Sequence, residues 1–226
     1  MTLQFTQPTA LILIDNQQAF TNPTTISQWG TTRSNPNYEQ NLQNLLTTFR
    51  TARSSSQVPL EVIHIFHTSL DKHPLFHPSN HPTNLLPLDF ATPAPDGSEP
   101  VFWKNVNSSF IGTGLEAHLR ERGFRQLIFA GLTTDHCVST TVRMAANLRV
   151  VDRFPDGPVR LRADGSHENA GVVDYGRIVL VGDATATFGK KGIDSETIQR
   201  VSLVSLDGEF ADVLPTEEVV EALRRI

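Results

Sequence analysis

The sequence contains few residues of several kinds, and each shortage excludes a class of protein. One cysteine among 226 residues rules out a disulfide within the chain. A lone thiol fits a reducing compartment, so we expect a cytoplasmic protein. No apolar run approaches the ~20 residues needed to span a bilayer. The opening segment, residues 1–8, lacks a charged stretch followed by an apolar one, so we expect no signal peptide.

Positive charge is also scarce. The chain has 19 Lys and Arg against 24 Asp and Glu, which gives a net charge of −5, and it has no basic cluster. This balance argues against nucleic acid and an anionic membrane surface as main partners. The hydrophobic fraction of 38% is ordinary for a globular protein, and the length fits a single domain over 1–226.

Short apolar runs alternate with stretches of helical period. The runs predict buried strands at residues 10–14, 60–66, 101–103, 127–132, 177–181 and 211–214. The periodic stretches predict helices at residues 37–56, 112–122, 138–148, 193–206 and 216–223, the last capped by Thr216. Repeated strand–helix units predict an α/β fold: a three-layer, doubly wound, mostly parallel six-stranded sheet, Rossmann-like, with helices on both faces.

Two segments interrupt this alternation. Residues 71–99 are rich in Pro, His and Asn and match no regular element, so we expect a long loop that could close a binding site. Residues 149–176 carry turn signals without a helical period. We expect an insertion there, an irregular hairpin with Asp156–Gly157 at its tip.

The single cysteine, Cys137, lies where a predicted strand ends and a helix begins. Thr134 or Asp135 can cap that helix, and its free N–H groups favour negative charge, hence the reactive thiolate. This context predicts a nucleophile. The alternative is a buried structural thiol, since free cysteines are often buried.

Two further charged residues directly follow predicted strands. Asp15 follows the first strand and Lys104 follows the third. In a parallel sheet these ends open onto one edge, together with Cys137. Asp15 could accept the thiol proton and return it to a leaving group, while Lys104 could stabilise the thiolate and keep Asp15 ionised. Taken singly, Asp15 could instead be a turn cap and Lys104 a solvated surface lysine.

Four motifs surround these residues in order along the chain. They are Asp15-x-Gln17-x-x-Phe20, Lys104 with Asn107–Thr113, Gly131–Val138 with its Gly-x-x-Thr-x-x-Cys-Val pattern, and Asp183–Phe188. The set resembles the isochorismatase-like cysteine hydrolase superfamily, which includes nicotinamidases, carbamoylsarcosine amidases, ureidoacrylate amidohydrolases and biuret hydrolases. The resemblance covers nearly the whole chain apart from residues 149–176.

This resemblance implies an isochorismatase-like fold and a catalytic triad of Cys137, Asp15 and Lys104. It also implies a cis peptide between Leu132 and Thr133, with an oxyanion hole formed by the N–H groups of Thr133 and Cys137. The implied reaction is attack on an amide or related carbonyl, release of ammonia or an amine, and hydrolysis of the acyl-thioester. Isochorismatases proper cleave a vinyl ether and lack this cysteine, so Cys137 argues against that activity. The resemblance further implies a homo-oligomer, a dimer or tetramer.

Several side chains near the triad are predicted substrate contacts. They are Gln17, Phe20, His67, Trp103, Asn107, Phe110 and His136. Core packing is an equal alternative for Phe110, and His64, inside a strand, is predicted to be a buried structural residue.

Metal binding is the remaining question raised by the eight histidines. Asp71 and His73 superficially match a ligand pair of nicotinamidases, with His77 and His81 nearby. The pair comes late after the second strand, and His-Pro pairs suit a proline-rich loop, so we predict no metal and no cofactor.

We therefore predict a metal-free cysteine hydrolase of a small amide, ureido or similar carbonyl compound. The alternatives are a metal-dependent nicotinamidase-like amidase and a catalytically idle relative that binds a small molecule or a partner protein, its site reshaped by residues 149–176. A redox thiol would lack a second cysteine within the chain to resolve it.

Overall fold

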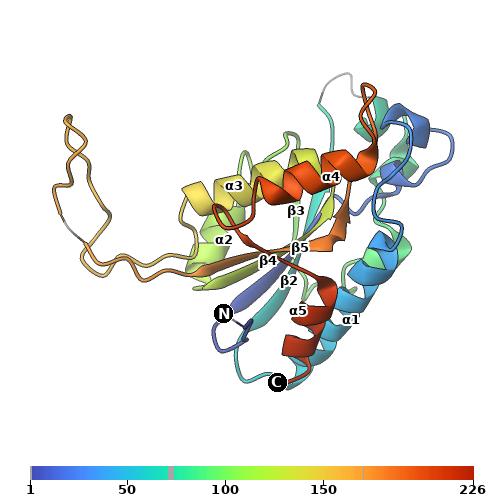
Figure 1. Cartoon of the computed structure of the whole chain (residues 1–226). Coiled ribbons are helices and arrows are strands. Elements are labelled where there is room, and N and C mark those ends of the chain that lie inside the picture. Colours follow the sequence, from blue (N-terminus) through green and yellow to red (C-terminus); the bar gives the residue numbers. More distant parts are fainter. Residues whose placement is uncertain (1, 71–73, 170) are drawn as a thin grey trace.

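A single sheet of six parallel strands forms the centre of the computed structural model, which describes residues 2–70, 74–169 and 171–226 (Figure 1). The strand order is β3-β2-β1-β4-β5-β6. The strands are β1 (Thr9–Ile14), β2 (Leu60–His67), β3 (Val101–Lys104), β4 (Gln126–Leu132), β5 (Arg177–Ala186) and β6 (Asp212–Leu214). The order reverses between β1 and β4, so a crevice opens at their carboxyl ends, where such sheets bind ligands.

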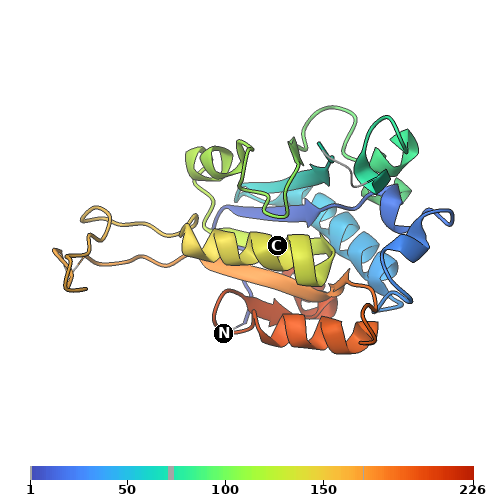
Figure 2. The same ribbon diagram turned by 90° about the horizontal axis from the view of Figure 1, so that it is seen from above.

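Five α-helices cover the two faces of this sheet. They are α1 (Tyr38–Ser55), α2 (Leu115–Glu121), α3 (Ser139–Asn147), α4 (Ser195–Val204) and α5 (Thr216–Leu223). Helices α1 and α5 lie on one face, and α2, α3 and α4 lie on the other (Figures 1 and 2). The predicted three-layer α/β fold is confirmed, with every strand pair parallel rather than most of them.

Burial on both faces explains the continuous apolar runs of the central strands. All six residues of β1 are buried. Leu11 and Leu13 pack in the core beneath α1, whereas Ile12 and Ile14 pack in the core beneath α3. Because successive side chains of a strand point to opposite faces, a strand between two helical layers needs apolar residues at every position.

The helix after the cysteine begins differently from the prediction. A wide helical turn, Thr134–Val138, precedes α3. Neither predicted cap serves this turn, because the Thr134 hydroxyl donates to Gln199 at 2.6 Å and Asp135 binds other side chains. The capping prediction is therefore wrong. Similarly, Thr216 is the first residue of α5 rather than its cap, and its N–H and hydroxyl both donate to Asp183, at 2.7 Å each.

The Pro-rich loop contains short 3-10 turns in its described part, at Pro74–Phe76, Pro82–Leu85 and Asp89–Ala91. Leu88 donates its N–H to the carbonyl of Asn16 at 2.8 Å, which ties the loop to the segment after β1. The candidate metal ligands Asp71 and His73 fall outside the described residues.

The described residues of the segment 152–175 leave the body as a long arm between α3 and β5 (Figures 1 and 2). The predicted insertion is present, but its tip is elsewhere. Arg162 donates its N–H to the carbonyl of Ser166 at 2.8 Å, so the chain reverses at Asp164–Gly165. Asp156–Gly157 forms a turn nearer the root, where Gly157 donates to Phe154 at 3.0 Å. Both Asp-Gly pairs suit a turn, and the pairing of the flanking residues decides which one reverses the arm. Among the helices of the described chain, none has the length and apolar character needed to cross a bilayer.

Candidate active site

The three predicted catalytic side chains meet at the carboxyl edge of the sheet. The Nζ atom of Lys104 lies 2.7 Å from Oδ2 of Asp15 and 3.2 Å from Sγ of Cys137. Asp15 directly follows β1, Lys104 ends β3, and Cys137 lies in the turn after β4. Lys104 and Asp15 are only 2% and 1% exposed, so water screens their ion pair very little.

His67, the last residue of β2, contacts the end of the Lys104 side chain. Strand β2 separates β3 from β1, so the lysine side chain crosses the end of β2, and its Nζ lies 3.2 Å from Nδ1 of His67. The three N–H groups of the ammonium thus have three acceptors. Gln17 fixes this histidine, because its amide accepts from the His67 N–H at 2.8 Å and donates to the His67 carbonyl at 3.0 Å.

The charges of the site are set by burial and by these contacts. Burial alone would lower the pKa of Lys104, but Asp15 and Cys137 beside it raise that pKa, so the side chain is an ammonium. Burial raises the pKa of the Cys137 thiol well above its ordinary range, and the charge of Asp15 adds to this, while Lys104 opposes it. The helix start therefore does not outweigh burial, and the raised pKa favours a protonated thiol, which leaves a proton for Asp15 to accept.

One oxygen of Asp15 is unpaired. Oδ2 accepts from Lys104, whereas Oδ1 is buried and has no hydrogen-bond partner among the described residues. A buried carboxylate oxygen without a donor is costly, so this atom is suited to accept a proton or an N–H from a bound molecule. Asp15 also has a φ of 50°, which is uncommon for a residue with a side chain.

The backbone after β4 is shaped for close approach to β1. The peptide bond between Leu132 and Thr133 is cis, as the resemblance implied. Just before it, Gly131 has a φ of 128°, and a Cβ there would lie 2.1 Å from the carbonyl oxygen of Ile14. Within the described chain, the N–H of Thr133 donates no hydrogen bond. This donor and the thiol of Cys137 belong to the wall of one cavity.

That cavity has a volume of about 520 Å³. Its lining is Asp15, Phe20, Gln28, Trp29, His67, Ser69, Phe76, Asn105, Asn107, Thr133, His136, Cys137, Phe188 and Lys190. Four of these residues form an aromatic wall, defined here as Phe20, Trp29, Phe76 and Phe188. The ring of Phe20 lies 4.5 Å from that of Trp29 and 5.5 Å from that of Phe76. The size and the mixture of apolar and polar lining suit a small organic molecule.

Asp135 organises a polar part of the lining. It accepts from Lys190 at 2.6 Å and from the hydroxyl of Thr187. A third partner is His136, whose Nε2 lies 3.5 Å from Oδ2 of Asp135. Burial would raise the pKa of Asp135, but the bonds from Lys190 and Thr187 lower it, so the carboxylate is charged. The ion pair places a cation, Lys190, in the cavity wall.

The predicted substrate contacts divide into two groups. Phe20, His67, Asn107 and His136 line the cavity, and the Cys137 thiol donates weakly to Asn107 Oδ1 at 3.8 Å. The other three are placed elsewhere. Gln17 is buried and its amide is committed to the backbone of His67. Trp103 is 46% exposed and packs on Phe66 of β2, and Phe110 lies in the core beneath α3.

Sequence reasoning missed much of the wall. The missed lining residues include Trp29, Phe76, Phe188 and Lys190. Trp29 and Phe76 lie in short turns that carry no motif, so only the fold reveals them. Phe188 ends a motif that was recognised, and its position after β5, at the same sheet edge, was the available signal.

One group of possible metal ligands occurs in the described chain, and it coincides with the triad. Asp15, His67 and Cys137 each offer one ligand atom, and these atoms lie within 4.8 Å of one another. The ammonium of Lys104 already contacts all three. A metal ion there would have to displace a cation that the site itself supplies.

Comparison with known proteins agrees with this fold. Residues 9–151 match the isochorismatase domain, well over half of the chain. The chain belongs to the isochorismatase family. The isochorismatase family protein YrdC of Bacillus subtilis strain 168 is 35% identical over 216 residues, which cover 93% of this chain and 94% of YrdC.

Solved structures of similar proteins have the same fold. A protein of this family from Chromobacterium violaceum ATCC 12472 is 32% identical, with a TM-score of 0.75, and the match covers 100% of this chain and 99% of that one. A cysteine hydrolase from Pseudomonas syringae pv. phaseolicola 1448A is 20% identical, with a TM-score of 0.71. That match covers 100% of this chain and 98% of the hydrolase.

Proposed function

We propose that this isochorismatase-family chain is a cysteine-dependent hydrolase of a small amide, ureido or similar carbonyl compound. The observation that carries the proposal is the ammonium of Lys104, which lies within hydrogen-bond distance of both Asp15 and Cys137 in the cavity wall. A nucleophile, a base and a fixed cation in one desolvated site are what covalent acyl transfer requires. The name of the Pseudomonas syringae protein of the same fold, a cysteine hydrolase, supports the class.

Because burial favours the protonated form of the thiol, a base must take its proton as it attacks. Asp15 has the unpaired oxygen for this purpose. The sulfur of Cys137 then bonds to the substrate carbonyl carbon, and the π electron pair moves to the carbonyl oxygen. The N–H groups of Thr133 and Cys137 stabilise that oxyanion, and Lys104 offsets the negative charge.

The same carboxyl group completes the cycle. As the C–N bond breaks, Asp15 returns the proton to the departing nitrogen, which leaves as ammonia or an amine. A water then gives a proton to Asp15 and its oxygen bonds to the thioester carbon. The C–S bond breaks, the sulfur recovers the proton, and the carboxylic or carbamic acid departs.

The aromatic wall indicates which kind of compound the cavity favours. Four rings from separate segments form one side of a cavity of about 520 Å³, which favours a compound with a flat or apolar substituent beside its carbonyl group.

A screen for ammonia release tests the proposal. Small aryl and alkyl amides, ureas and N-carbamoyl compounds are incubated with wild-type protein and with Cys137→Ala and Cys137→Ser. We expect turnover of at least one compound by wild type alone, with an acyl adduct on Cys137 in the intact mass. Thermal melting shows whether the variants are folded. Turnover by folded Cys137→Ala at the wild-type rate would overturn the covalent mechanism.

A further inference from the structure

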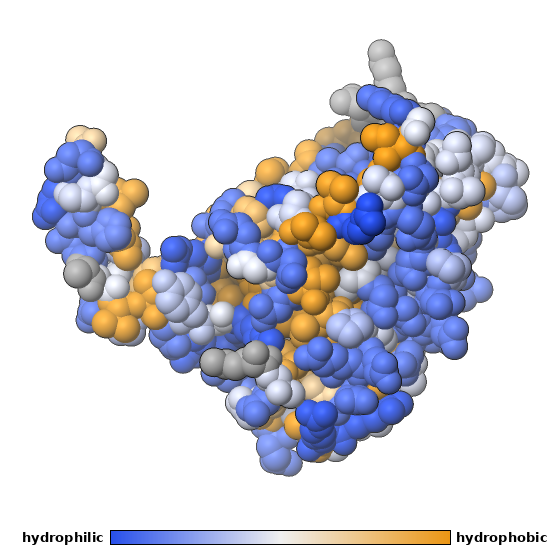
Figure 3. Space-filling view, in the orientation of Figure 1, coloured by the Kyte–Doolittle hydropathy of each residue, from blue (hydrophilic) through white to orange (hydrophobic). Residues whose placement is uncertain are grey.

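The arm formed by residues 152–175 has no core of its own. Among its described residues none is buried, and three large apolar side chains are exposed: Leu161 by 66%, Val172 by 64% and Tyr175 by 69%. Figure 3 shows the arm as a separate lobe with apolar side chains on its surface. An arm of this kind exposes apolar area that the body does not cover.

Hydrogen bonds local to its tip and its root, rather than a core, hold the arm in shape. Arg153 pairs with Asp174 at the root, and Leu161 pairs with His167 near the tip. An isolated two-stranded ribbon is marginally stable in water, because ordering its backbone costs more entropy than such pairs recover. The extended arm would therefore gain stability from a surface that covers its exposed apolar side chains.

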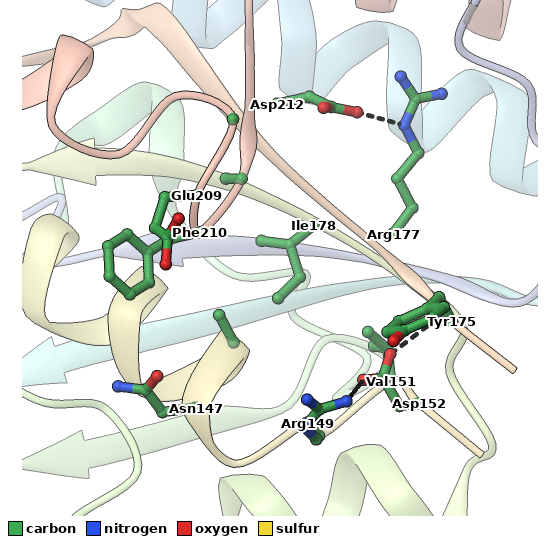
Figure 4. Close-up of a pocket in the computed structure, with 14 residues that line it drawn as sticks. Asn147, Arg149, Val151, Asp152, Tyr175, Arg177, Ile178, Glu209, Phe210 and Asp212 are labelled. Carbon is green, nitrogen blue, oxygen red and sulfur yellow. Dashed lines mark hydrogen bonds and ion pairs between the residues drawn. The ribbon is translucent and has the colours of Figure 1, made fainter. Parts of the chain in front are cut away.

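A cleft at the root of the arm offers such a surface. It has a volume of about 450 Å³ and lies between the end of α3, the arm root and the segment before β6 (Figure 4). Phe210, Ile178 and Tyr175 form the apolar part of a lining that is otherwise largely polar and charged. The cleft lies at the amino ends of β5 and β6, the edge of the sheet opposite to Cys137.

The charges of the cleft leave one carboxylate unpaired. Arg177 lies 2.8 Å from Asp212, and Arg149 lies 3.5 Å from Asp152. Glu209 is exposed and has no ion pair among the described residues. The cleft thus combines an apolar part of its lining with a free negative charge.

The outer part of the arm has the complementary pattern. The exposed Leu161 is flanked by Arg160 and Arg162. The guanidinium of Arg160 makes no hydrogen bond or ion pair in the part of the chain that the structure describes, while that of Arg162 bonds within the arm tip. An apolar side chain beside a free cation fits the apolar part of this cleft and its free carboxylate.

We propose that two copies of this chain exchange arms, with the arm tip of each copy seated in the root cleft of the other. The arm points away from the body (Figure 1), and about ten residues at no more than ~3.3 Å each carry its tip up to roughly 30 Å outward, away from its own cleft. When two such arms lie antiparallel about a two-fold axis, each tip meets the partner's root. The contact is then made twice, as in isologous dimers.

The mass of the protein in solution, measured by light scattering after size exclusion across a concentration series, is the first test. We expect a dimer or a larger even assembly for wild type. Replacing residues 155–172 by Asn-Gly retains the Arg153–Asp174 pair and removes the arm. The assembly that this variant forms in solution should have half the mass of the wild-type assembly or less. A wild-type monomer at ~100 μM, or an arm-free variant of unchanged assembly, would overturn the proposal.

A charge exchange in the full-length chain tests whether Arg160 of one copy meets Glu209 of the other. This test decides between arm exchange and its absence if the arm-free variant does not fold. Arg160→Glu and Glu209→Arg should each weaken dimerisation about tenfold, and the double variant should recover most of that loss. Arg200→Glu, exposed on α4, is the matched control and should dimerise as wild type does. Additive losses in the double variant would show that the two residues do not meet, and would refute the exchange as proposed.

Discussion

The Nδ1 atom of His67 lies 3.2 Å from Nζ of Lys104 and is the third acceptor of its ammonium, beside Asp15 and Cys137. An imidazole accepts at Nδ1 only when it is neutral and carries its proton on Nε2. The histidine therefore orients the lysine, and a second positive charge on its ring would push the ammonium away. The Gln17 amide fixes the histidine backbone and so extends this control.

The first prediction concerns this orientation. His67→Ala should lower kcat about 10- to 100-fold, a loss typical of residues that orient a catalytic group through a hydrogen bond. His67→Asn, whose amide oxygen can replace Nδ1 as the acceptor, should retain most of the activity. Steady-state kinetics of the three proteins decide this. A His67→Ala variant with wild-type kcat would show that the contact has no role in orientation.

Asp15→Asn should separate thiol reactivity from turnover. The charge of Asp15 raises the pKa of the Cys137 thiol, so its removal should lower that pKa and speed alkylation by iodoacetamide. The amide cannot shuttle a proton, so turnover should fall by a factor of about 100 or more. Lys104→Met removes the opposing charge and should slow alkylation. Slower alkylation of the folded Asp15→Asn variant than of wild type would contradict this electrostatic account.

The aromatic wall should act in binding rather than in chemistry. Trp29→Ala or Phe188→Ala removes a ring from the cavity and should raise KM about tenfold, with the alkylation rate of Cys137 unchanged. Trp103→Ala is a matched control, because this exposed ring lies outside the lining. If Trp103→Ala raised KM as much as Trp29→Ala, the substrate would bind elsewhere.

Glu99 should contribute stability that depends on pH. Burial would raise its pKa, but hydrogen bonds from Arg50, His64 and the N–H of Ala94 lower it to about 2. Since the folded pKa is below the unfolded one, the contribution is present above pH ~4.5 and is lost as the pH falls towards 2. It amounts to about 3 kcal/mol at neutral pH, with roughly 2 kcal/mol lost by pH 3.

Urea unfolding of wild type and Glu99→Gln at pH 7 and pH 3 measures this contribution. The variant should be less stable at pH 7, and the difference between the two proteins should shrink at pH 3. A difference that stays constant over this range would exclude ionisation of Glu99 as its source.

The sequence predicted the sheet well because burial on both faces leaves a strong local signature. Continuous apolar runs such as 10–14 are typical of strands buried between two helical layers, and the ends of those runs located Asp15, Lys104 and Cys137. Helix ends were less predictable. Thr134 and Asp135 were expected to cap a helix, but distant partners, Gln199 and Lys190, bind them instead.

The cavity was only partly predictable because its wall is assembled from distant turns. Phe20 was found since it belongs to a motif, whereas Trp29 and Phe76 lie in irregular segments that only the folded chain brings together. Proximity in sequence also misled. Trp103 is next to Lys104, but adjacent residues of a strand point to opposite faces, and its ring faces away from the cavity.

Gly131 should be the least replaceable glycine of the site. Its φ of 128° is disfavoured for any side chain, and an added Cβ would lie 2.1 Å from the carbonyl oxygen of Ile14 and 2.7 Å from its N, both backbone atoms that cannot move without separating β1 from β4. Gly131→Ala should therefore destabilise the fold by about 4 kcal/mol or more. Gly123→Ala is the control: its φ of 68° is also positive, but nothing lies within 4 Å of the added atom, so only the backbone cost of about 1 kcal/mol applies. Chemical unfolding measures the free energy of unfolding that each variant loses. Equal losses in Gly131→Ala and Gly123→Ala would show that the close approach of β4 to β1 imposes no special constraint.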